Sequence, residues 1–310
     1  MTKVAYLFPG QGSQQVGMGL DLYEGFSSAR AVFDEADEVL GFSLSRLCFE
    51  GPEEELKLTS NAQPALVTMS FACLVAAQEA LQDALPAASF VAGHSLGEYT
   101  ALAAAEVFDF ATAVYLARER GRLMHEASLL KPGAMVAVIG MDEEPLQGIC
   151  QETGAWIANR NCPGQIVISG EAASVEKASE LAKAHGAKLV MPLQVSGAFH
   201  SPLMQPVVEG MSEVLAGVGL SDPAIPIIGN TKAQLIRDSE MVKLELLEQI
   251  CGCVQWHGSI EFLLSQGVTS FVEFGPGKVL SGLNKRISKD AKTSNISDAK
   301  TIAAFAESTE

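Results

Sequence analysis

The chain has 310 residues, of which 48% are apolar and 19% are charged. This length fits one large domain or a large domain with a smaller insert, and the composition excludes a disordered or collagen-like chain. Lys and Arg number 21 against 37 Asp and Glu, a net charge of −16, and such a field repels nucleic acid and anionic lipid, so neither a nucleic acid nor a membrane is expected as a partner.

The sequence gives no sign of export or membrane insertion. The start lacks the basic, apolar and cleavage regions of a signal peptide, and no stretch has the 18 uncharged apolar residues of a transmembrane helix. Six cysteines are scattered along the chain, which suits a reducing compartment. We expect a cytoplasmic protein. We interpret Cys251-Gly252-Cys253 as free thiols and expect no metal, because an isolated C-x-C pair is a weak metal signal.

Short apolar strands alternate with helices along the chain. This alternation is typical of a parallel sheet covered on both faces, so we expect the α/β class. The polar residues 289–297 are expected to be loose, and residues 299–306 to form a short final helix. The strands are expected at 4–8, 90–92, 134–139, 165–169, 188–191, 225–228 and 270–274. The principal helices are expected at 98–106, 111–126, 143–153 and 172–186.

Residues 130–196 have a pattern of their own. Short β-type segments and two helices follow each other in the order β-α-β-β-α-β, which is typical of a ferredoxin-like unit. Turn-type sequences, Lys131-Pro132-Gly133 and Val195-Ser196-Gly197, would be its entry and exit. We therefore expect a small subdomain at 130–196, inserted into a large one formed by 1–129 and 197–310.

Ser95 is the candidate nucleophile. It lies in Gly93-His94-Ser95-Leu96-Gly97, between an apolar strand and an Ala-rich helix. In this context, the two glycines of G-x-S-x-G permit a sharp turn that exposes the serine Oγ and points the helix N-terminus at it. The amide of Leu96 is then an oxyanion donor. The motif also arises by chance, but the strand and helix around it favour a nucleophile.

A nucleophilic serine needs a base, and the chain has five histidines. His200 is favoured because it lies in an irregular, Gly-containing loop before a helix, where catalytic groups are often held. A capping or buried structural histidine is the alternative. We expect His94 to point away from Ser95, His185 to close a helix, and His125 and His257 to be surface groups.

Arg120 occupies the apolar face of the helix 111–126. A guanidinium that faces the core needs an anion, and its own helical stripe offers none. A ligand carboxylate bound bidentately would supply the anion, and a structural salt bridge to a distant acid is the alternative.

Two glycine-containing loops remain. The sequence Phe8-Pro-Gly-Gln-Gly-Ser-Gln14 lacks both the dinucleotide pattern and a P-loop lysine. We expect it beside Ser95, where Gln11 or backbone amides reach the nucleophile. The sequence Glu273-Phe-Gly-Pro-Gly-Lys278 is interpreted as architecture.

Taken together, these motifs resemble those of the malonyl-CoA:acyl carrier protein transacylases, the freestanding acyltransferases of bacterial-type fatty acid synthesis. The resemblance runs nearly from end to end, and it implies a hydrolase-like large subdomain with a parallel sheet and an inserted ferredoxin-like small subdomain. The motifs that carry it are 8–14, 63–66, 93–99, 120–121, 161–165, 197–200 and 273–278.

The resemblance implies roles for the matching residues. Ser95 would attack the malonyl thioester with His200 as general base. The amides of Leu96 and Gln11 would stabilise the oxyanion, and Arg120 would bind the malonyl carboxylate.

Other roles concern the surroundings of the reacting groups. A backbone carbonyl at the position of Gln249 would orient the histidine, although the chain departs from the family pattern nearby, at Cys251-Gly252-Cys253. Asn159 and Asn161 would line the cleft. Phe199, with Leu96, matches malonyl-preferring members, because a bulky Phe fills the space that an α-methyl group needs.

The implied reaction is a ping-pong transfer of malonyl from malonyl-CoA to the phosphopantetheine thiol of acyl carrier protein. The CoA thioester and the phosphopantetheine come with the substrates, so no cofactor is expected, and we expect a monomer. An acidic carrier would need a basic patch, for which the candidates are Lys278, Lys285, Arg286 and Lys289; a solvated helix face is the alternative. A thioesterase, which needs no core-facing arginine, and a non-catalytic carrier-binding scaffold are the other functions considered.

Overall fold

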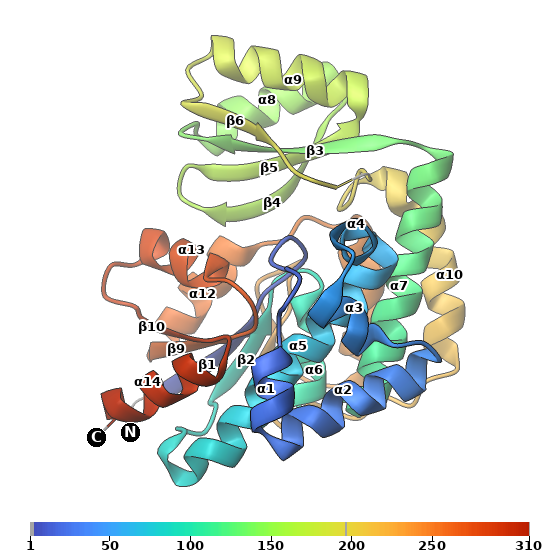
Figure 1. Cartoon of the computed structure of the whole chain (residues 1–310). Coiled ribbons are helices and arrows are strands. Elements are labelled where there is room, and N and C mark those ends of the chain that lie inside the picture. The colour runs from blue at the N-terminus through green and yellow to red at the C-terminus, as the bar shows by residue number, and fades with distance from the viewer. Residues whose placement is uncertain (1–2, 196, 310) are drawn as a thin grey trace.

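The computed structural model describes residues 3–195 and 197–309, so Ser196 of the predicted exit turn lies outside the described residues. The chain forms a six-stranded sheet and a separate four-stranded sheet. In Figure 1 the smaller sheet and its two helices lie over one end of the larger unit, and the helix α7 (Phe110–Leu130) leads from one to the other. The predicted α/β class is confirmed.

The six-stranded sheet has the order β10-β9-β1-β2-β7-β8. Its neighbouring strands are parallel, except for the antiparallel pair β7–β8. A parallel sheet must be covered on both faces, and the side chains of β1 show that both faces are buried. Val4, Tyr6 and Phe8 pack into the core on one face, whereas Ala5 and Leu7 pack with Trp256 on the other. The strands are β1 (Lys3–Phe8), β2 (Phe90–Gly93), β7 (Ile227–Ile228), β8 (Leu235–Ile236), β9 (Val268–Phe274) and β10 (Lys292–Ile296).

The four-stranded sheet is antiparallel and has the order β4-β5-β3-β6. Its elements follow the predicted chain order, β-α-β-β-α-β. The helices α8 and α9 cover the face that is turned away from the larger unit (Figure 1). The elements are β3 (Gly133–Ile139), α8 (Glu143–Thr153), β4 (Trp156–Cys162), β5 (Gln165–Glu171), α9 (Ala172–Ala184) and β6 (Leu189–Pro192).

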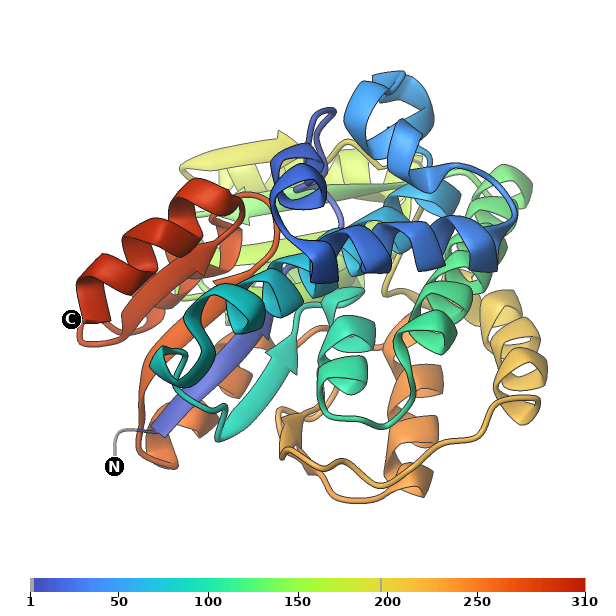
Figure 2. The same cartoon turned by 60° about the horizontal axis from the view of Figure 1, so that its bottom comes forward.

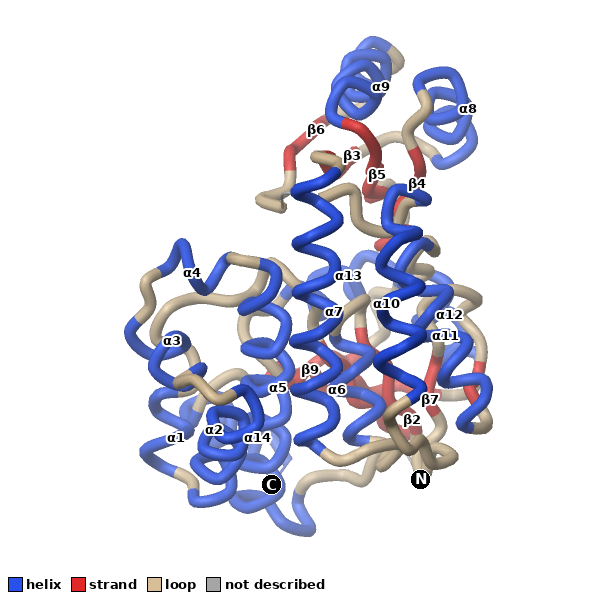
Figure 3. Tube along the Cα trace, turned by 90° about the vertical axis from the view of Figure 1, so that its right-hand side faces the viewer, coloured by secondary structure: helices blue, strands red, loops and turns tan. Residues whose placement is uncertain are grey.

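The helix α5 (Thr59–Leu81) is the central helix of the larger unit. The segment 59–84 is long and apolar enough to cross a membrane, but 72% of its apolar window is buried inside the fold, as in a core helix. Figure 2 shows α5 with α2 beside the parallel strands, and Figure 3 shows α7 and α10 running toward the small sheet. The other helices before the small unit are α1 (Leu20–Gly25), α2 (Ser27–Leu40), α3 (Leu44–Glu50), α4 (Glu53–Lys57), η1 (Gln82–Ala84) and α6 (Gly97–Ala104). Those after it are η2 (Pro202–Met204), α10 (Gln205–Ala216), α11 (Ser239–Cys251), α12 (Trp256–Ser265), α13 (Val279–Ile287) and α14 (Ala299–Thr309).

The expectation that residues 289–297 are loose is wrong. Residues Lys292–Ile296 form β10, which pairs in parallel with β9 along its whole length. An edge strand has one hydrogen-bonded side and a half-exposed surface, so a polar sequence is compatible with it. The final helix is present as α14, as predicted.

Candidate active site

Ser95 lies on the sharp turn between β2 and α6. Its φ is 51°, a left-handed conformation that is uncommon for a residue with a side chain. The glycines on either side make this turn possible. A Cβ at Gly93 would overlap the backbone of Gly97, and a Cβ at Gly97 would overlap the carbonyl oxygen of Phe8. The backbone chains therefore approach too closely for any residue but glycine.

His200 completes a hydrogen-bonded pair with Ser95. Its Nε2 lies 2.8 Å from Ser95 Oγ, and its Nδ1 lies 2.9 Å from the carbonyl O of Gln249 and 3.0 Å from that of Gly252. Carbonyl oxygens only accept, so Nδ1 donates to them and carries the proton of the neutral ring. The free lone pair on Nε2 then faces the serine hydroxyl.

The surroundings keep this histidine neutral. His200 is 4% exposed, and burial lowers its pKa to about 3, with a further lowering by the positive charge of Arg120. Both effects disfavour the imidazolium form. At neutral pH the ring is therefore uncharged.

Arg120 reaches the same serine from α7. It is 1% exposed, and its Nη2 donates to Ser95 Oγ at 3.2 Å and to Gln249 Oε1 at 2.7 Å, while Nη1 donates to Gln63 Oε1 at 2.8 Å. Among the ion pairs of residues 3–195 and 197–309, none includes Arg120. The salt-bridge alternative is therefore wrong for the described residues. The buried guanidinium is surrounded by neutral partners.

These groups open into a pocket of about 250 Å³ between the two sheets. The larger unit contributes the reactive groups and the small sheet contributes part of the opposite wall, including Asn159 and Asn161 from β4. The predicted site residues on its wall are Gln11, Ser95, Arg120, Asn159, Asn161, Phe199 and His200.

Two predicted residues lie just outside this wall. Gln249 bonds Arg120 and His200 from α11, and Leu96 is fully buried at the N-cap of α6, next to the nucleophile. The side chain of Gln11 donates to Thr59 Oγ1 at 3.2 Å, so any oxyanion contact from Gln11 would come from its backbone amide.

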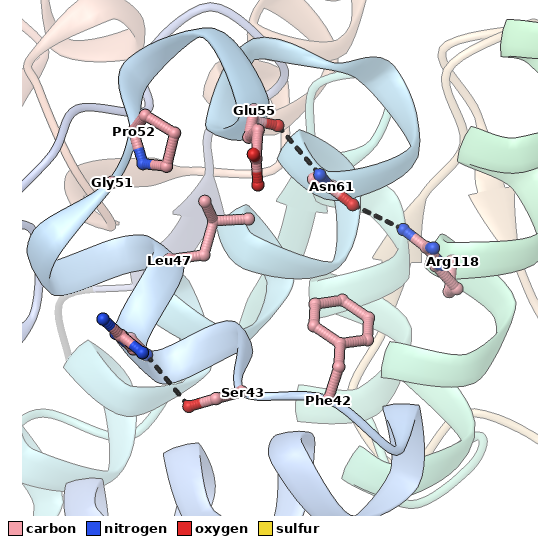
Figure 4. Close-up of a pocket in the computed structure, with 9 residues that line it drawn as sticks. Phe42, Ser43, Leu47, Gly51, Pro52, Glu55, Asn61 and Arg118 are labelled. Carbon is pink, nitrogen blue, oxygen red and sulfur yellow. Dashed lines mark hydrogen bonds between the residues drawn. The ribbon is translucent and has the colours of Figure 1, made fainter.

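A second pocket lies between α3, α4 and α7. Figure 4 shows that Phe42, Asn61 and Arg118 line it, and Arg118 donates to Asn61 there. The predicted nucleophile, base and core-facing arginine are all absent from this wall. The candidate active site is therefore the pocket at Ser95.

His94 is bonded to the small sheet and not to Ser95, as predicted. It lines the pocket, and its Nε2 lies 2.9 Å from Asn161 Oδ1 on the small sheet. It therefore does not point away from the cleft, although its bond is with Asn161 and not with the serine. His185 accompanies the end of α9, as predicted, with Nδ1 2.8 Å from the carbonyl O of Leu181.

Three polar residues were missed by the sequence reasoning. Asn230 accepts from the Ser95 amide at 2.7 Å and donates to Gly93 O at 2.8 Å. Glu98 and Gln63 are both completely buried, and they bond to Asn230 and Arg120 respectively. The sequence signal that could have found them is a single polar residue within an apolar helix, as for Gln63 and Glu98, or shortly after an apolar strand, as for Asn230.

The cysteine pair has hydrogen-bonding neighbours. Arg160 Nη1 donates to Cys253 Sγ at 3.1 Å, and Cys251 Sγ lies 3.9 Å from Gln205 Oε1. All six cysteines are free thiols. Within the described part of the chain, no three His, Cys, Asp or Glu side chains are grouped as metal ligands.

Comparison with known proteins identifies the family. Residues 5–306 match the acyl transferase domain family. The chain is 50% identical over 307 residues to the malonyl CoA-acyl carrier protein transacylase of Bacillus subtilis (strain 168), covering 97% of this chain and 96% of that protein.

Solved structures give the same result. The acyl-carrier-protein-S-malonyltransferase of Bartonella henselae has a TM-score of 0.94 at 43% identity, over 99% of both chains. A malonyl-transacylase solved in complex with its type II PKS acyl-carrier protein has a TM-score of 0.95 at 40% identity, over 99% of this chain and 100% of the other. The chain therefore belongs to the malonyl-CoA:acyl carrier protein transacylases, enzymes built on the acyl transferase domain.

Proposed function

We propose that this chain moves a malonyl group from malonyl-CoA to the phosphopantetheine thiol of an acyl carrier protein, through an acyl-enzyme on Ser95. The observation that carries this proposal is that a serine–histidine pair and a buried arginine without a carboxylate partner meet at one oxygen, Ser95 Oγ. The relative solved together with its acyl-carrier protein supports the choice of acceptor.

In the first half-reaction, His200 Nε2 takes the proton of Ser95 as Oγ forms a bond to the thioester carbon. The C–S bond then breaks and the proton passes to the departing CoA thiol. In the second half-reaction, the phosphopantetheine thiol gives its proton to His200 as its sulfur attacks the acyl-enzyme carbonyl. The C–O bond to Ser95 then breaks, and His200 returns the proton to Ser95 Oγ. One thioester replaces another, so the exchange is ping-pong and needs no cofactor.

The backbone amides of Leu96 and Gln11 would bind the oxyanion of the tetrahedral intermediate, since Leu96 begins α6 and Gln11 lines the pocket. Arg120 would bind the malonyl carboxylate through two N–H groups, exchanging neutral partners for an ionic one. Asn159 and Asn161 would complete the wall that the acyl chain contacts.

Phe199 supports malonyl over bulkier groups. It is 5% exposed and lines the pocket immediately before the base. An α-methyl group would have to displace its ring, although one methyl group changes binding by only about 1 to 3 kcal/mol.

The carrier would approach over α13. Lys278, Lys285 and Lys289 are exposed there, and Val279, which lines the pocket, is 54% exposed. Arg286 is instead engaged with Gln165 and Pro163 of the small unit. We propose these lysines as the contact for an acidic carrier, and we propose a monomer that acts in the cytoplasm.

The two sheets fit the division into subdomains. The antiparallel order β4-β5-β3-β6 with two helices on one face supports a ferredoxin-like small subdomain at 130–196. The parallel sheet, with a serine on a strand-to-helix turn, supports a hydrolase-like large subdomain formed by the remainder.

Intact-mass measurement tests the function directly. The protein is mixed with malonyl-CoA alone, the experiment is repeated with Ser95→Ala, and holo acyl carrier protein is then added. We expect a malonyl adduct that requires Ser95 and passes to the carrier. An adduct that decays to free malonate whether or not the carrier is present would instead identify a thioesterase. If no adduct forms on the folded protein, the site or the acyl donor is wrong.

A further inference from the structure

We propose that Glu98 is a positioning residue that sets the acyl-group preference of the enzyme, because it fixes the Gln249 amide and thereby leaves Arg120 free for a substrate carboxylate. The inference rests on the proposed function, in which Arg120 binds that carboxylate. It concerns a residue of α6 that no step of the proposed reaction uses.

Glu98 is a buried carboxylate held by hydrogen bonds. It is 0% exposed, its Oε1 accepts from Asn230 N at 3.0 Å and Asn230 Nδ2 at 2.7 Å, and its Oε2 accepts from Gln249 Nε2 at 2.6 Å. Among the described residues, no ion pair includes Glu98. Burial and the neighbouring Glu245 carboxyl raise the pKa of Glu98, but every bond to it comes from an N–H donor, and these donors favour the carboxylate form in which both oxygens accept.

This arrangement determines which way the Gln249 amide points. Its Nε2 donates to Glu98 and to the carbonyl O of Ser95, the latter at 2.9 Å, and so both N–H groups are used. Its Oε1 must then face Arg120, to which it lies at 2.7 Å. The flipped amide would place oxygen against two acceptors and N–H groups against a guanidinium, which leaves four buried polar groups unsatisfied.

The positive charge of Arg120 is therefore hydrogen-bonded by neutral amides and is not paired with a carboxylate among the described residues. Gln249 Oε1 and Gln63 Oε1 accept from its two terminal nitrogens, and the nearest carboxylate of this network, Glu98, is one amide away. The buried Nε of Arg120 has no hydrogen-bond partner among the described residues. A carboxylate that enters the pocket therefore meets no carboxylate already bonded to the guanidinium.

Glu98→Gln tests this arrangement with little change in shape. The new side-chain oxygen still accepts from Asn230, so the turn that carries Ser95 is retained, but the new amide nitrogen faces Gln249. The Gln249 amide must turn its oxygen toward that nitrogen and its own N–H groups toward Arg120, which displaces the guanidinium. We expect kcat/KM for malonyl-CoA to fall roughly 100-fold, and that for acetyl-CoA to change by less than about threefold.

A charge swap gives a second, independent test. In the double variant Glu98→Gln, Gln249→Glu, an amide again faces a carboxylate, but the bond from the side chain of residue 249 to the carbonyl O of Ser95 is lost. The carboxylate now contacts Arg120 directly and competes with the substrate. We expect the lost bond to Ser95 to lower both transfers alike, and the malonyl-to-acetyl ratio of kcat/KM to fall by roughly 100-fold in addition. A malonyl-to-acetyl ratio at the wild-type level in this variant would overturn the proposal.

Glu273→Gln is the matched control. Glu273 is also a completely buried carboxylate that accepts from backbone amides, but it caps α13, and no hydrogen bond among the described residues joins it to Gln249 or Arg120. We expect its malonyl-to-acetyl ratio to remain that of the wild type, whatever its loss of stability. An equal fall of both acyl groups in Glu98→Gln would show a merely structural role and overturn the proposal.

The wild-type measurement separates the two claims. If Ser95-dependent malonylation is present in the wild type and the ratio is unchanged in Glu98→Gln, the positioning role is wrong and the proposed function stands. If the wild type forms no malonyl adduct, both are overturned. If Glu98→Gln does not fold, the double variant decides the matter, since the expected outcome there is a folded enzyme with a lowered malonyl-to-acetyl ratio.

Discussion

Two turns at the same edge of the parallel sheet have the same design and different uses. Both β2 to α6 and β9 to α13 run from a buried strand through glycines into a helix. At the second turn, the carboxylate of Glu273 accepts from the amides of Leu280 and Ser281, the first turn of α13. A helix N-terminus attracts anions, and here the protein supplies its own.

The first turn differs at the corresponding position. Among residues 3–195 and 197–309, no side chain caps the N-terminus of α6, and the buried acid nearby, Glu98, bonds to Asn230 and Gln249 instead. The two turns therefore differ in whether a side chain of the protein already satisfies the helix end.

Removal of the Arg120 guanidinium, which lies beside the first turn, should have the largest effect. Arg120→Ala leaves a malonyl carboxylate without its partner, and we expect a loss of about 2 to 5 kcal/mol in transition-state stabilisation for malonyl transfer, with acetyl transfer spared or raised. Steady-state kcat/KM with both acyl-CoA donors measures it. Equal losses for malonyl and acetyl would contradict the role of Arg120 as the carboxylate ligand.

Filling the first turn should break the fold locally. Gly97→Ala places a Cβ against the carbonyl oxygen of Phe8, and we expect the free energy of unfolding to fall by about 3 kcal/mol. Gly282→Ala in α13 is the control, because a Cβ there meets nothing within 4 Å and improves helix propensity by about 0.5 to 1 kcal/mol. Urea unfolding of both variants measures the difference, and similar stabilities would show that the close approach is not required.

Breaking the second turn should affect stability alone. Glu273→Ala leaves the amides of Leu280 and Ser281 without their acceptor, and we expect a loss of about 1 to 3 kcal/mol in the free energy of unfolding. Because Glu273 does not contact the reacting groups, the rate of Ser95 acylation at 25 °C should stay near that of the wild type. A large loss of that rate in a folded variant would give this turn a part in the reaction.

The pH dependence of kcat/KM should report the lowered pKa of His200, which is bonded to Ser95 at the first turn. With the pKa of His200 at about 3, kcat/KM should stay nearly constant down to about pH 5, whereas a histidine of ordinary pKa would lose about tenfold at pH 5.5. Arg120→Ala removes a positive charge that lowers this pKa, so the acid limb should move upward in that variant. An acid limb near pH 6.5 in the wild type would contradict the neutral, buried histidine.

Much of this architecture could be predicted from the sequence. The period and length of the apolar runs predicted the α/β class and the order of elements in the small unit, because burial on two sheet faces demands such runs. The residues 292–296 escaped prediction. Their polar sequence carries no apolar signal, and their strand state comes from hydrogen bonds to β9, which only the assembled sheet supplies.

Within the site, the sequence by itself determined the groups whose local pattern is unusual. Glycines around Ser95 permit only one kind of turn, and an arginine on an apolar helical face needs a special partner. What only the tertiary structure decided is how these groups combine. His200 meets Ser95 across 105 residues, and Gln249 joins Glu98 to Arg120 across the sheet edge. Such long-range contacts depend on packing between elements, which leaves no periodic signal in the sequence. They also decide that the buried guanidinium of Arg120 is bonded by two neutral amides.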